Sequence, residues 1–181
     1  YHSLAGLLTD TNRIPEAIAV YEQMLGSTPQ AYHVRLQIAQ LFEKQNDSQR
    51  ALDQYLQFLR LDDTNADARR RAGVLLIDVG RASEAVDLLN VSPDQDGAGH
   101  FHFLRAYALE VSGQVDKAFV LYQETAPENA YYTHAHIRAA QIRGRAGAWD
   151  EAEALLQSAR ALRPEAPELI VAMGATKVSA E

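Results

Sequence analysis

The sequence predicts an all-α fold, a solenoid of antiparallel helix pairs, and three observations support this prediction. Small residues recur at a nearly constant interval of about 34 residues, at Ala17, Ala51, Ala85, Ala118 and Ala152. Two further series of residues keep the same interval, and the apolar residues between them follow helical rather than strand spacing. A repeat of this length is typical of proteins in which each unit is one helical hairpin.

The second series consists of small residues twelve positions before the first, and it comprises Ala5, Ala39, Gly73, Ala106, Ala140 and Gly174. Small residues that face each other on antiparallel helices allow the two backbones to approach closely. A larger residue follows four positions after the first series, at Tyr21, Tyr55, Leu89, Tyr122 and Leu156. We expect this larger side chain to fill the space beside the close contact.

The third series predicts where the first helix of each unit ends, and it comprises Asn12, Asn46, Gly80, Gly113 and Gly147. Asn and Gly tolerate the left-handed backbone that closes a helix C-terminus. Residues suited to a helix start follow each of them, at Pro15, Ser48, Ser83, Asp116 and Asp150. The predicted unit is therefore a helix, a tight turn and a second helix, repeated five times.

Three segments, 38–63, 72–89 and 140–164, are similar to the tetratricopeptide repeat. The resemblance implies a right-handed superhelix whose concave groove, lined by the first helix of each pair, binds proteins. The predicted units of this single domain are 1–31, 32–65, 66–98, 99–132 and 133–166, followed by a terminal helix at 167–178. Because Tyr1 falls inside the first helix of its unit, we expect the chain to be a fragment of a longer protein.

Two units depart from the pattern. Pro93, Gly97 and Gly99 replace the end of the second helix in the third unit, so a loop is expected at 92–99. Pro127 is expected to end the second helix of the fourth unit early.

Composition limits the classes of partner. The 181 residues include 24 acidic and 17 basic side chains, and the formal charge of −7 disfavours nucleic acid as a partner. The sequence has no apolar run of about 18 residues, so membrane insertion is not expected. Without cysteine there is neither a disulfide nor a Cys-ligated metal, and both the cytoplasm and the periplasm remain open.

The resemblance also implies which side chains face the groove, because they come from early and middle positions of each first helix. These candidate peptide-binding residues are His33, Gln37, Gln40, Lys44, Arg70, Arg71, Val74, Phe103, Tyr107, Arg138, Gln141 and Arg145. Arginine forks suit carboxylates, and aromatic side chains make good anchors. The sequence therefore predicts a protein or peptide ligand that carries acidic and apolar side chains.

An alternative for the arginines is that they pair with Asp67, Asp78 or Glu110 of neighbouring helices and only make the surface soluble. His100 and His134 occupy equivalent repeat positions, but the sequence offers no obvious third ligand, so no metal site is expected. No cofactor and no enzymatic activity are expected either, because the motifs of nucleotide-binding proteins, hydrolases and metalloproteases are missing.

Two further functional interpretations stay open. The chain could be the docking or regulatory region of a larger bacterial enzyme, or of a machine that assembles polysaccharide or the cell envelope. The excess of arginine over lysine, together with abundant alanine, favours a bacterial origin. Self-association is also possible, because the ends of a repeat array expose apolar surface.

Overall fold

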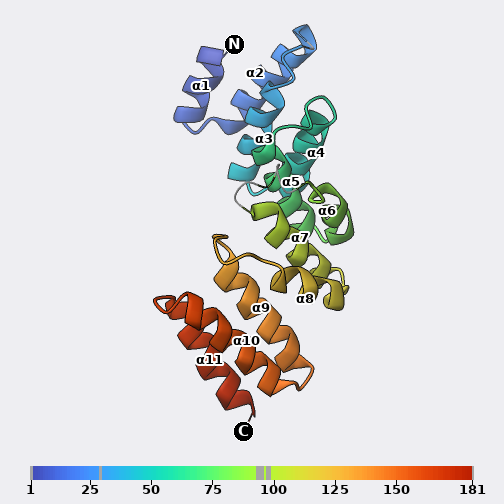
Figure 1. Cartoon of the computed structure of the whole chain (residues 1–181). Helices are drawn as coiled ribbons and strands as arrows, with labels where there is room; N and C mark the ends of the chain where they lie inside the picture. Colours follow the sequence, from blue (N-terminus) through green and yellow to red (C-terminus); the bar gives the residue numbers. More distant parts are fainter. Residues whose placement is uncertain (1, 29, 93–95, 97–98, 181) are drawn as a thin grey trace. The chain divides into compact units, whose positions relative to one another are not determined.

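The computed structural model describes residues 2–28, 30–92, 96 and 99–180, and within them it contains helices and no strand, as Figure 1 shows. The predicted all-α fold is confirmed. The helices are α1 (His2–Asp10), α2 (Ile14–Ser27), α3 (Val34–Lys44), α4 (Ser48–Leu59), α5 (Ala66–Asp78), α6 (Ala82–Leu88), α7 (His100–Val111), α8 (Val115–Gln123), α9 (Tyr132–Arg145), α10 (Trp149–Leu162) and α11 (Pro167–Ala180).

The chain divides into two compact parts that each contain several helices. We call them unit 1 (Tyr1–Arg81) and unit 2 (Ala82–Glu181), and from here on a single helix pair is called a repeat. The division falls inside the third predicted repeat, because α5 belongs to unit 1 and α6 to unit 2. One continuous solenoid with a single groove along its whole length therefore stays a prediction.

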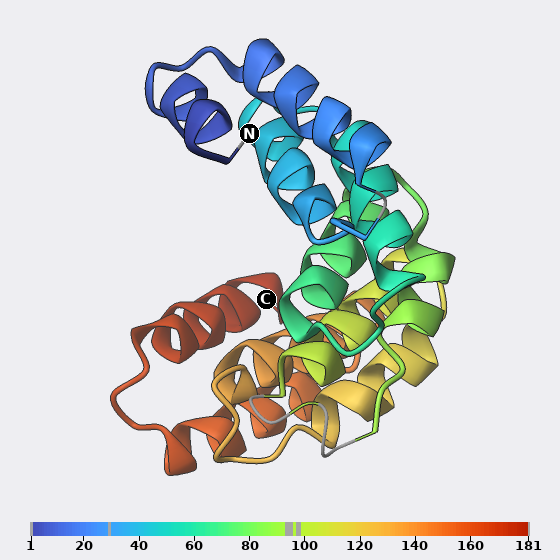
Figure 2. The same ribbon diagram turned by 90° about the horizontal axis from the view of Figure 1, so that it is seen from above.

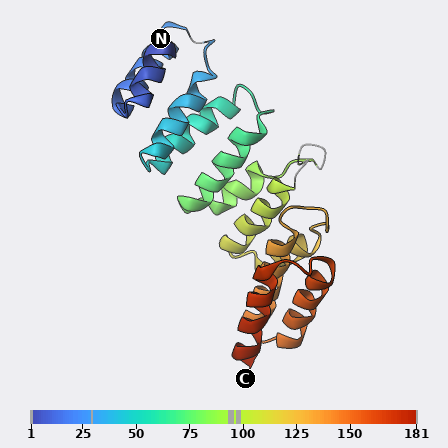
Figure 3. The same cartoon turned by 90° about the vertical axis from the view of Figure 1, so that its left-hand side faces the viewer.

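Within each unit, helices that are consecutive in the sequence pack against each other. In unit 1 the packed pairs are α1 with α2, α2 with α3, α3 with α4 and α4 with α5. Figures 2 and 3 show the short turn that joins the antiparallel helices α1 and α2. In unit 2 each helix from α6 to α11 packs against the next, and α11 also contacts α9.

The turn inside each helix pair has the predicted left-handed residue. The φ angles are 57° at Asn12 and Asn46, 79° at Gly80 and Gly147, and 83° at Gly113. After each of these residues, the next N–H bonds back to the carbonyl five positions earlier, as from Gln114 to Leu109 at 2.9 Å. This hydrogen bond closes the helix C-terminus, and it recurs in all five turns.

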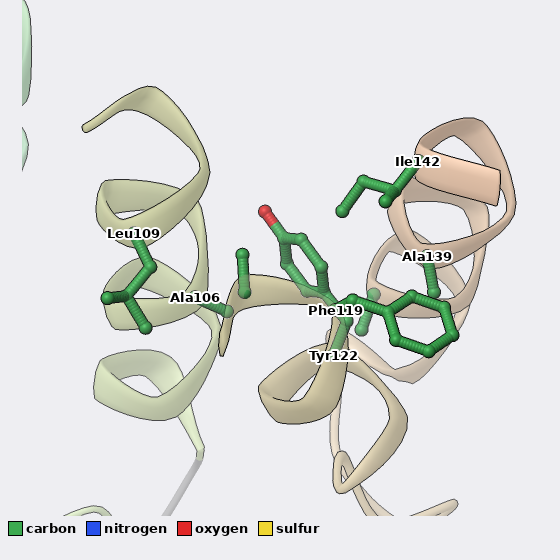
Figure 4. Packing of buried hydrophobic residues seen from close by; sticks show 8 residues of the cluster. Ala106, Leu109, Phe119, Tyr122, Ala139 and Ile142 are labelled. Carbon is green, nitrogen blue, oxygen red and sulfur yellow. The ribbon is translucent and has the colours of Figure 1, made fainter. Parts of the chain in front are cut away.

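The small residues of both series lie where helices touch. Ala17, Ala51, Ala85 and Ala118 are 0% exposed and Ala152 is 1% exposed. The larger residues of the neighbouring series are buried too, and Figure 4 shows one of them, Tyr122, packed with Ala106, Phe119 and Ile142. Gly174 of α11, at the sixth position of the second series, is exposed. The prediction of close helix contacts is confirmed for the four pairs that lie within one unit: α1 with α2, α3 with α4, α7 with α8, and α9 with α10.

Replacing Ala51 with Leu should destabilise unit 1 by about 1–3 kcal/mol, because the buried position has no room for three more carbon atoms. Urea denaturation followed by circular dichroism measures this change. Ala19, exposed on α2, provides the matched control, and Ala19→Leu should leave the stability within about 0.5 kcal/mol of the original. An unchanged midpoint for Ala51→Leu would contradict the close contact.

The departures from the repeat are also confirmed where the structure describes them. Helix α6 ends at Leu88 and α8 at Gln123, so both second helices are short. Within the predicted loop, Ser92, Asp96 and Gly99 are not helical, while 93–95 and 97–98 lie outside the described residues. The terminal helix reaches Ala180, two positions beyond its predicted end.

The start of α7 depends on two residues of that loop. The carboxylate of Asp96 accepts hydrogen bonds from the backbone N–H groups of Phe101 at 3.0 Å and His102 at 2.7 Å. At Gly99, with a φ of 70°, a Cβ atom would lie 1.7 Å from the side-chain nitrogen Nδ2 of Asn129. Glycine is therefore favoured at position 99 by its backbone angle, and a side chain there would also have to displace the side-chain amide of Asn129.

Candidate functional site

A partly buried polar cluster links three consecutive helices of unit 1. The hydroxyl of Tyr55 on α4 donates a hydrogen bond to Glu43 Oε1 on α3, with an oxygen–oxygen distance of 2.5 Å. Arg71 on α5 donates to the other carboxylate oxygen of Glu43 at 2.9 Å. One carboxylate thus connects its own helix pair to the first helix of the next pair.

The same arrangement recurs in unit 2, two repeats further along the chain. Tyr122 on α8 donates to Glu110 Oε2 on α7 at 3.0 Å. Arg138 on α9 lies 3.6 Å from Glu110 Oε1, and Arg145 donates to the same atom at 3.0 Å. Figure 4 shows the ring of Tyr122 among apolar side chains, with its hydroxyl oxygen pointing away from Phe119. We call each arrangement a Tyr–Glu–Arg cluster.

Both tyrosines of these clusters stay neutral at ordinary pH. Burial raises the pKa of Tyr55, and the neighbouring Glu43 carboxylate raises it further. Burial and the Glu110 carboxylate raise the pKa of Tyr122 in the same way. A negative charge on either phenol would lie in a poorly hydrated place beside another negative charge.

The clusters limit what the predicted arginines of unit 1 can offer a ligand. Arg70 lies 2.5 Å from Asp67 Oδ1 and Arg71 lies 3.0 Å from Asp67 Oδ2. Asp67 and Glu43 together therefore offset the two positive charges of this pair. Asp67 pairs with both arginines inside α5, and Arg71 also meets Glu43 of a neighbouring helix, a carboxylate that is not among the three partners predicted from the sequence. Of those three, Glu110 pairs with arginines of a neighbouring helix. A binding role for Arg70 and Arg71 stays a prediction.

Unit 2 has a different charge balance. Arg138 and Arg145 share the single carboxylate of Glu110, whose side chain is 8% exposed. This group of three therefore keeps one net positive charge. The side chain of Arg145 is 62% exposed, so a ligand can reach that charge. Both arginines are paired within the chain, but their pairing does not neutralise them.

Aromatic side chains gather beside this charge, in a patch formed by His100, Phe103, Tyr131 and His134. The rings of Phe103 and Tyr131 stack with centroids 4.8 Å apart and planes inclined by 14°. His100 meets the edge of Tyr131 at 5.1 Å, and the His134 ring lies 6.4 Å from both Phe103 and Tyr131. We call these four residues the aromatic patch. All four keep some exposure to solvent.

Tyr107 connects the aromatic patch to the arginines. It lies one turn after Phe103 on α7, and the guanidinium of Arg138 stands 4.8 Å from the centre of its ring. Such a contact holds the cation over the face of the ring. Of the predicted groove residues, Phe103, Tyr107, Arg138 and Arg145 are thereby joined to one surface formed by α7 and α9.

The other predicted residues lie elsewhere. His33, Gln40 and Lys44 are exposed at or near α3 of unit 1, and Gln37 and Val74 are half-buried on α3 and α5. Because these residues belong to unit 1, the structure does not join them to the patch of unit 2. Their role in binding stays a prediction.

The remaining predicted residue, Gln141, lines a cavity of about 360 Å³ between α9, α10 and α11. Apolar side chains form most of its wall, with Trp149 and Arg145 beside them. A Cβ atom at Gly144 would lie 2.8 Å from the Trp149 ring, so the indole rests closely on the backbone of α9. The complete lining is Ile137, Ala140, Gln141, Gly144, Arg145, Trp149, Leu156, Ala172, Ala175 and Thr176.

The histidines have structural contacts. His102 Nε2 lies 2.8 Å from the carbonyl oxygen of Leu121, and His136 Nδ1 lies 3.0 Å from that of Tyr132. Burial lowers the pKa of His136. Among the described residues, no three His, Asp or Glu side chains are grouped closely enough to hold a metal ion. The helices of that part of the chain also include none with the length and apolarity to cross a membrane.

Sequence reasoning missed three features of this region: Tyr131, Trp149 and the tyrosine–glutamate hydrogen bonds. A signal for the last was present in the sequence. Tyrosine, glutamate and arginine each recur at an interval of two repeats, at Tyr55 and Tyr122, Glu43 and Glu110, and Arg71 and Arg138. No comparable periodic signal marks Tyr131 or Trp149.

Comparison with known proteins agrees with the repeat. Residues 36–100 match the family model described as tetratricopeptide repeat, and no curated protein sequence matches the chain. Among solved structures, YrrB, described as a TPR protein with an unusual peptide-binding site, has a TM-score of 0.74 at 19% identity, covering 97% of this chain and 89% of its own.

Two bacterial structures are similar in the same way. MamA from Desulfovibrio magneticus has a TM-score of 0.72 at 16% identity, covering 91% of this chain and 93% of its own. A thermophilic TPR protein of Thermus thermophilus has a TM-score of 0.60 at 18% identity, covering 97% and 96%. At these identities the likeness concerns the fold. The family model identifies residues 36–100 as tetratricopeptide repeat, and the fold of the chain is similar to that of solved tetratricopeptide repeat proteins.

Proposed function

We propose that the chain is a non-enzymatic scaffold that binds a protein or peptide segment on the surface of unit 2 formed by α7 and α9. The observation that carries this proposal is the partly exposed aromatic patch beside two arginines that share one carboxylate. The fold is consistent with it, since one structural neighbour, YrrB, is described as having a peptide-binding site. That description concerns YrrB alone.

The chemistry of the surface favours a ligand with one apolar and one acidic side chain. The stacked rings of Phe103 and Tyr131 offer a flat apolar face on which an aliphatic or aromatic side chain can pack. The positive charge that remains on Arg138 and Arg145 attracts a carboxylate at the same surface. In unit 1 the corresponding charges are balanced by acidic side chains, so we place the acidic preference in unit 2.

Selection of random displayed peptides on the full chain tests this proposal. We expect the selected peptides to be enriched in sequences that combine Asp or Glu with an aromatic or large aliphatic residue. Phe103→Ala should weaken binding of such a peptide about tenfold, and Arg145→Gln should weaken it several-fold, with fluorescence anisotropy as the readout.

Arg160→Gln is the matched control, because Arg160 is exposed near the end of α10 and lines neither the patch nor the cavity. Its affinity should equal that of the unmodified chain. Peptides without acidic residues, or equal affinities for Phe103→Ala and Arg160→Gln, would contradict the proposal. Circular dichroism of each variant separates lost binding from lost folding.

A further inference from the structure

The fifth repeat lacks the Tyr–Glu–Arg cluster, although it has the three positions that would carry it. Leu156 lies one repeat after Tyr122, Gly144 lies one repeat after Glu110, and Ala172 takes the place of arginine at the same interval after Arg138. Three long side chains are thus replaced by shorter ones at one place in unit 2.

Those three residues line the cavity between α9, α10 and α11. The polar cluster fills the equivalent space in the second and fourth repeats, where Tyr55 and Tyr122 are 1% and 0% exposed. In the fifth repeat α9, α10 and α11 also pack in sequence, α11 contacts α9 as well, and a cavity of about 360 Å³ lies beside the shorter side chains. The cavity therefore lies where the second and fourth repeats carry their Tyr–Glu–Arg clusters, and the indole of Trp149 forms one of its walls.

We propose that this cavity is an anchor site for one aromatic or large aliphatic side chain of the bound peptide, and that Arg145 receives a carboxylate beside that side chain. The inference rests on the proposed function and adds to it a second place of contact. The volume is at the lower end of the range for ligand sites, which suits one buried side chain with part of its backbone.

Charge supports a carboxylate as the neighbouring group. Arg145 lines the cavity, and its guanidinium also bonds to Glu110, which Arg138 shares. Since one carboxylate faces two guanidinium groups, a second carboxylate at Arg145 would find an unbalanced positive charge. Gln141 and Thr176 add amide and hydroxyl groups to the lining, to which a peptide backbone can bond.

One helix, α9, contributes side chains both to the cavity and to the surface beside the aromatic patch. Arg138, which covers the ring of Tyr107 on α7, and Arg145, which lines the cavity toward α11, are seven positions apart on α9. This separation is about two helical turns, or roughly 10 Å. An extended peptide of four or so residues spans that distance, so a single ligand can occupy both places.

Trp149 makes the test direct, because it is the sole tryptophan of the chain and it lines the cavity. Its fluorescence is followed while the full chain is titrated with acetyl-Phe-Asp-amide, acetyl-Ala-Asp-amide or acetyl-Phe-Lys-amide. We expect the Phe-Asp probe to change the emission in a saturable way, at a concentration about tenfold lower than the Ala-Asp probe. The Phe-Lys probe should be several-fold weaker than Phe-Asp.

Filling the cavity is the matching experiment. Ala175 lines it and is exposed on α11, so Ala175→Phe should abolish the response to Phe-Asp, and Thr176→Leu should weaken it. Ala161, exposed on α10 and away from the lining, gives the control Ala161→Phe, which should respond like the original chain. Equal responses to Phe-Asp and Ala-Asp, or a full response from both filled variants, would overturn the anchor site.

The selected peptides described above separate the two proposals. If Ala175→Phe and Phe103→Ala both weaken the binding of a selected peptide, the anchor site and the binding surface are both supported. If Phe103→Ala alone weakens the binding of that peptide, the proposed function is supported and the anchor site is wrong. If neither variant changes its affinity, both proposals fall.

Discussion

Replacing Tyr122 with alanine should destabilise unit 2 by about 3–5 kcal/mol, the largest effect that we expect from a single substitution in this chain. The ring of Tyr122 is 0% exposed and packs with Ala106, Leu109, Phe119 and Ile142. Its removal leaves a cavity between α7, α8 and α9, and it also takes the hydroxyl donor away from Glu110. Urea denaturation followed through Trp149 measures the change, because that tryptophan lies in unit 2.

Tyr122→Phe and Tyr122→Leu divide this loss into parts. Phenylalanine keeps the ring and removes one hydrogen bond, so it should cost about 1 kcal/mol. Leucine occurs at the equivalent positions 89 and 156, so the repeat tolerates it there, and it should give an intermediate loss. A loss below about 1 kcal/mol for Tyr122→Ala would contradict the close packing of this ring.

Stability should fall steeply above about pH 10, by roughly 1.4 kcal/mol per pH unit for each tyrosine of the two Tyr–Glu–Arg clusters. The ordinary pKa of tyrosine is 10.0, and burial together with the neighbouring glutamate raises the pKa of Tyr55 and Tyr122 well above it. Below pH 10 both the folded and the unfolded chain keep the phenol proton, so these groups cause no pH dependence there.

Above pH 10 the unfolded chain releases the proton of each phenol while the folded chain retains it. The unfolded state then binds fewer protons, and the free energy of unfolding decreases as pH rises until the folded phenols also ionise. Urea denaturation between about pH 8 and pH 11.5 follows this change, with Trp149 reporting on unit 2.

Tyr122→Phe is the control for unit 2, and Tyr55→Phe is the control for unit 1. Each removes one ionisable phenol, so each should reduce the slope above pH 10 by about 1.4 kcal/mol per pH unit. Burial also raises the pKa of Tyr21 and Tyr132, so part of the alkaline loss should remain in both variants. A flat stability from pH 9 to pH 11 would show that the hydroxyls of Tyr55 and Tyr122 are not buried in the folded chain.

The local features of the fold were predictable because they repeat. Asn46 and Gly113 end their helices in the left-handed conformation wherever the sequence places them, since the backbone angle depends on the residue itself and its close neighbours. Ala51 and Ala118 mark close helix contacts for a similar reason, because a small side chain at a fixed interval returns to the same face. The two short second helices were also predictable, because proline and glycine interrupt the helical pattern near their ends.

The binding surface was only partly predictable. Phe103, Tyr107, Arg138 and Arg145 lie on the first helices of their pairs, as the repeat predicts, but their contacts in the folded chain could not be predicted. Whether an arginine is paired depends on which acidic side chain lies opposite it, and Arg71 meets Glu43 from another helix pair. The recurrence of these residues at two repeats marks the arrangement but does not say which side chains meet, so the sequence left both interpretations of this arginine open.

The sequence by itself determined the all-α class, the helix pairs, their turns and their small-residue contacts, because all of these depend on interactions within about one repeat. The tertiary structure decided the rest: which charges cancel in unit 1 and which remain in unit 2, how Tyr131 stacks on Phe103, and that Gly144, Leu156 and Ala172 line a cavity beside Trp149. These features arise where side chains from different helices meet, and the distances between such side chains are set by the packing of the helices.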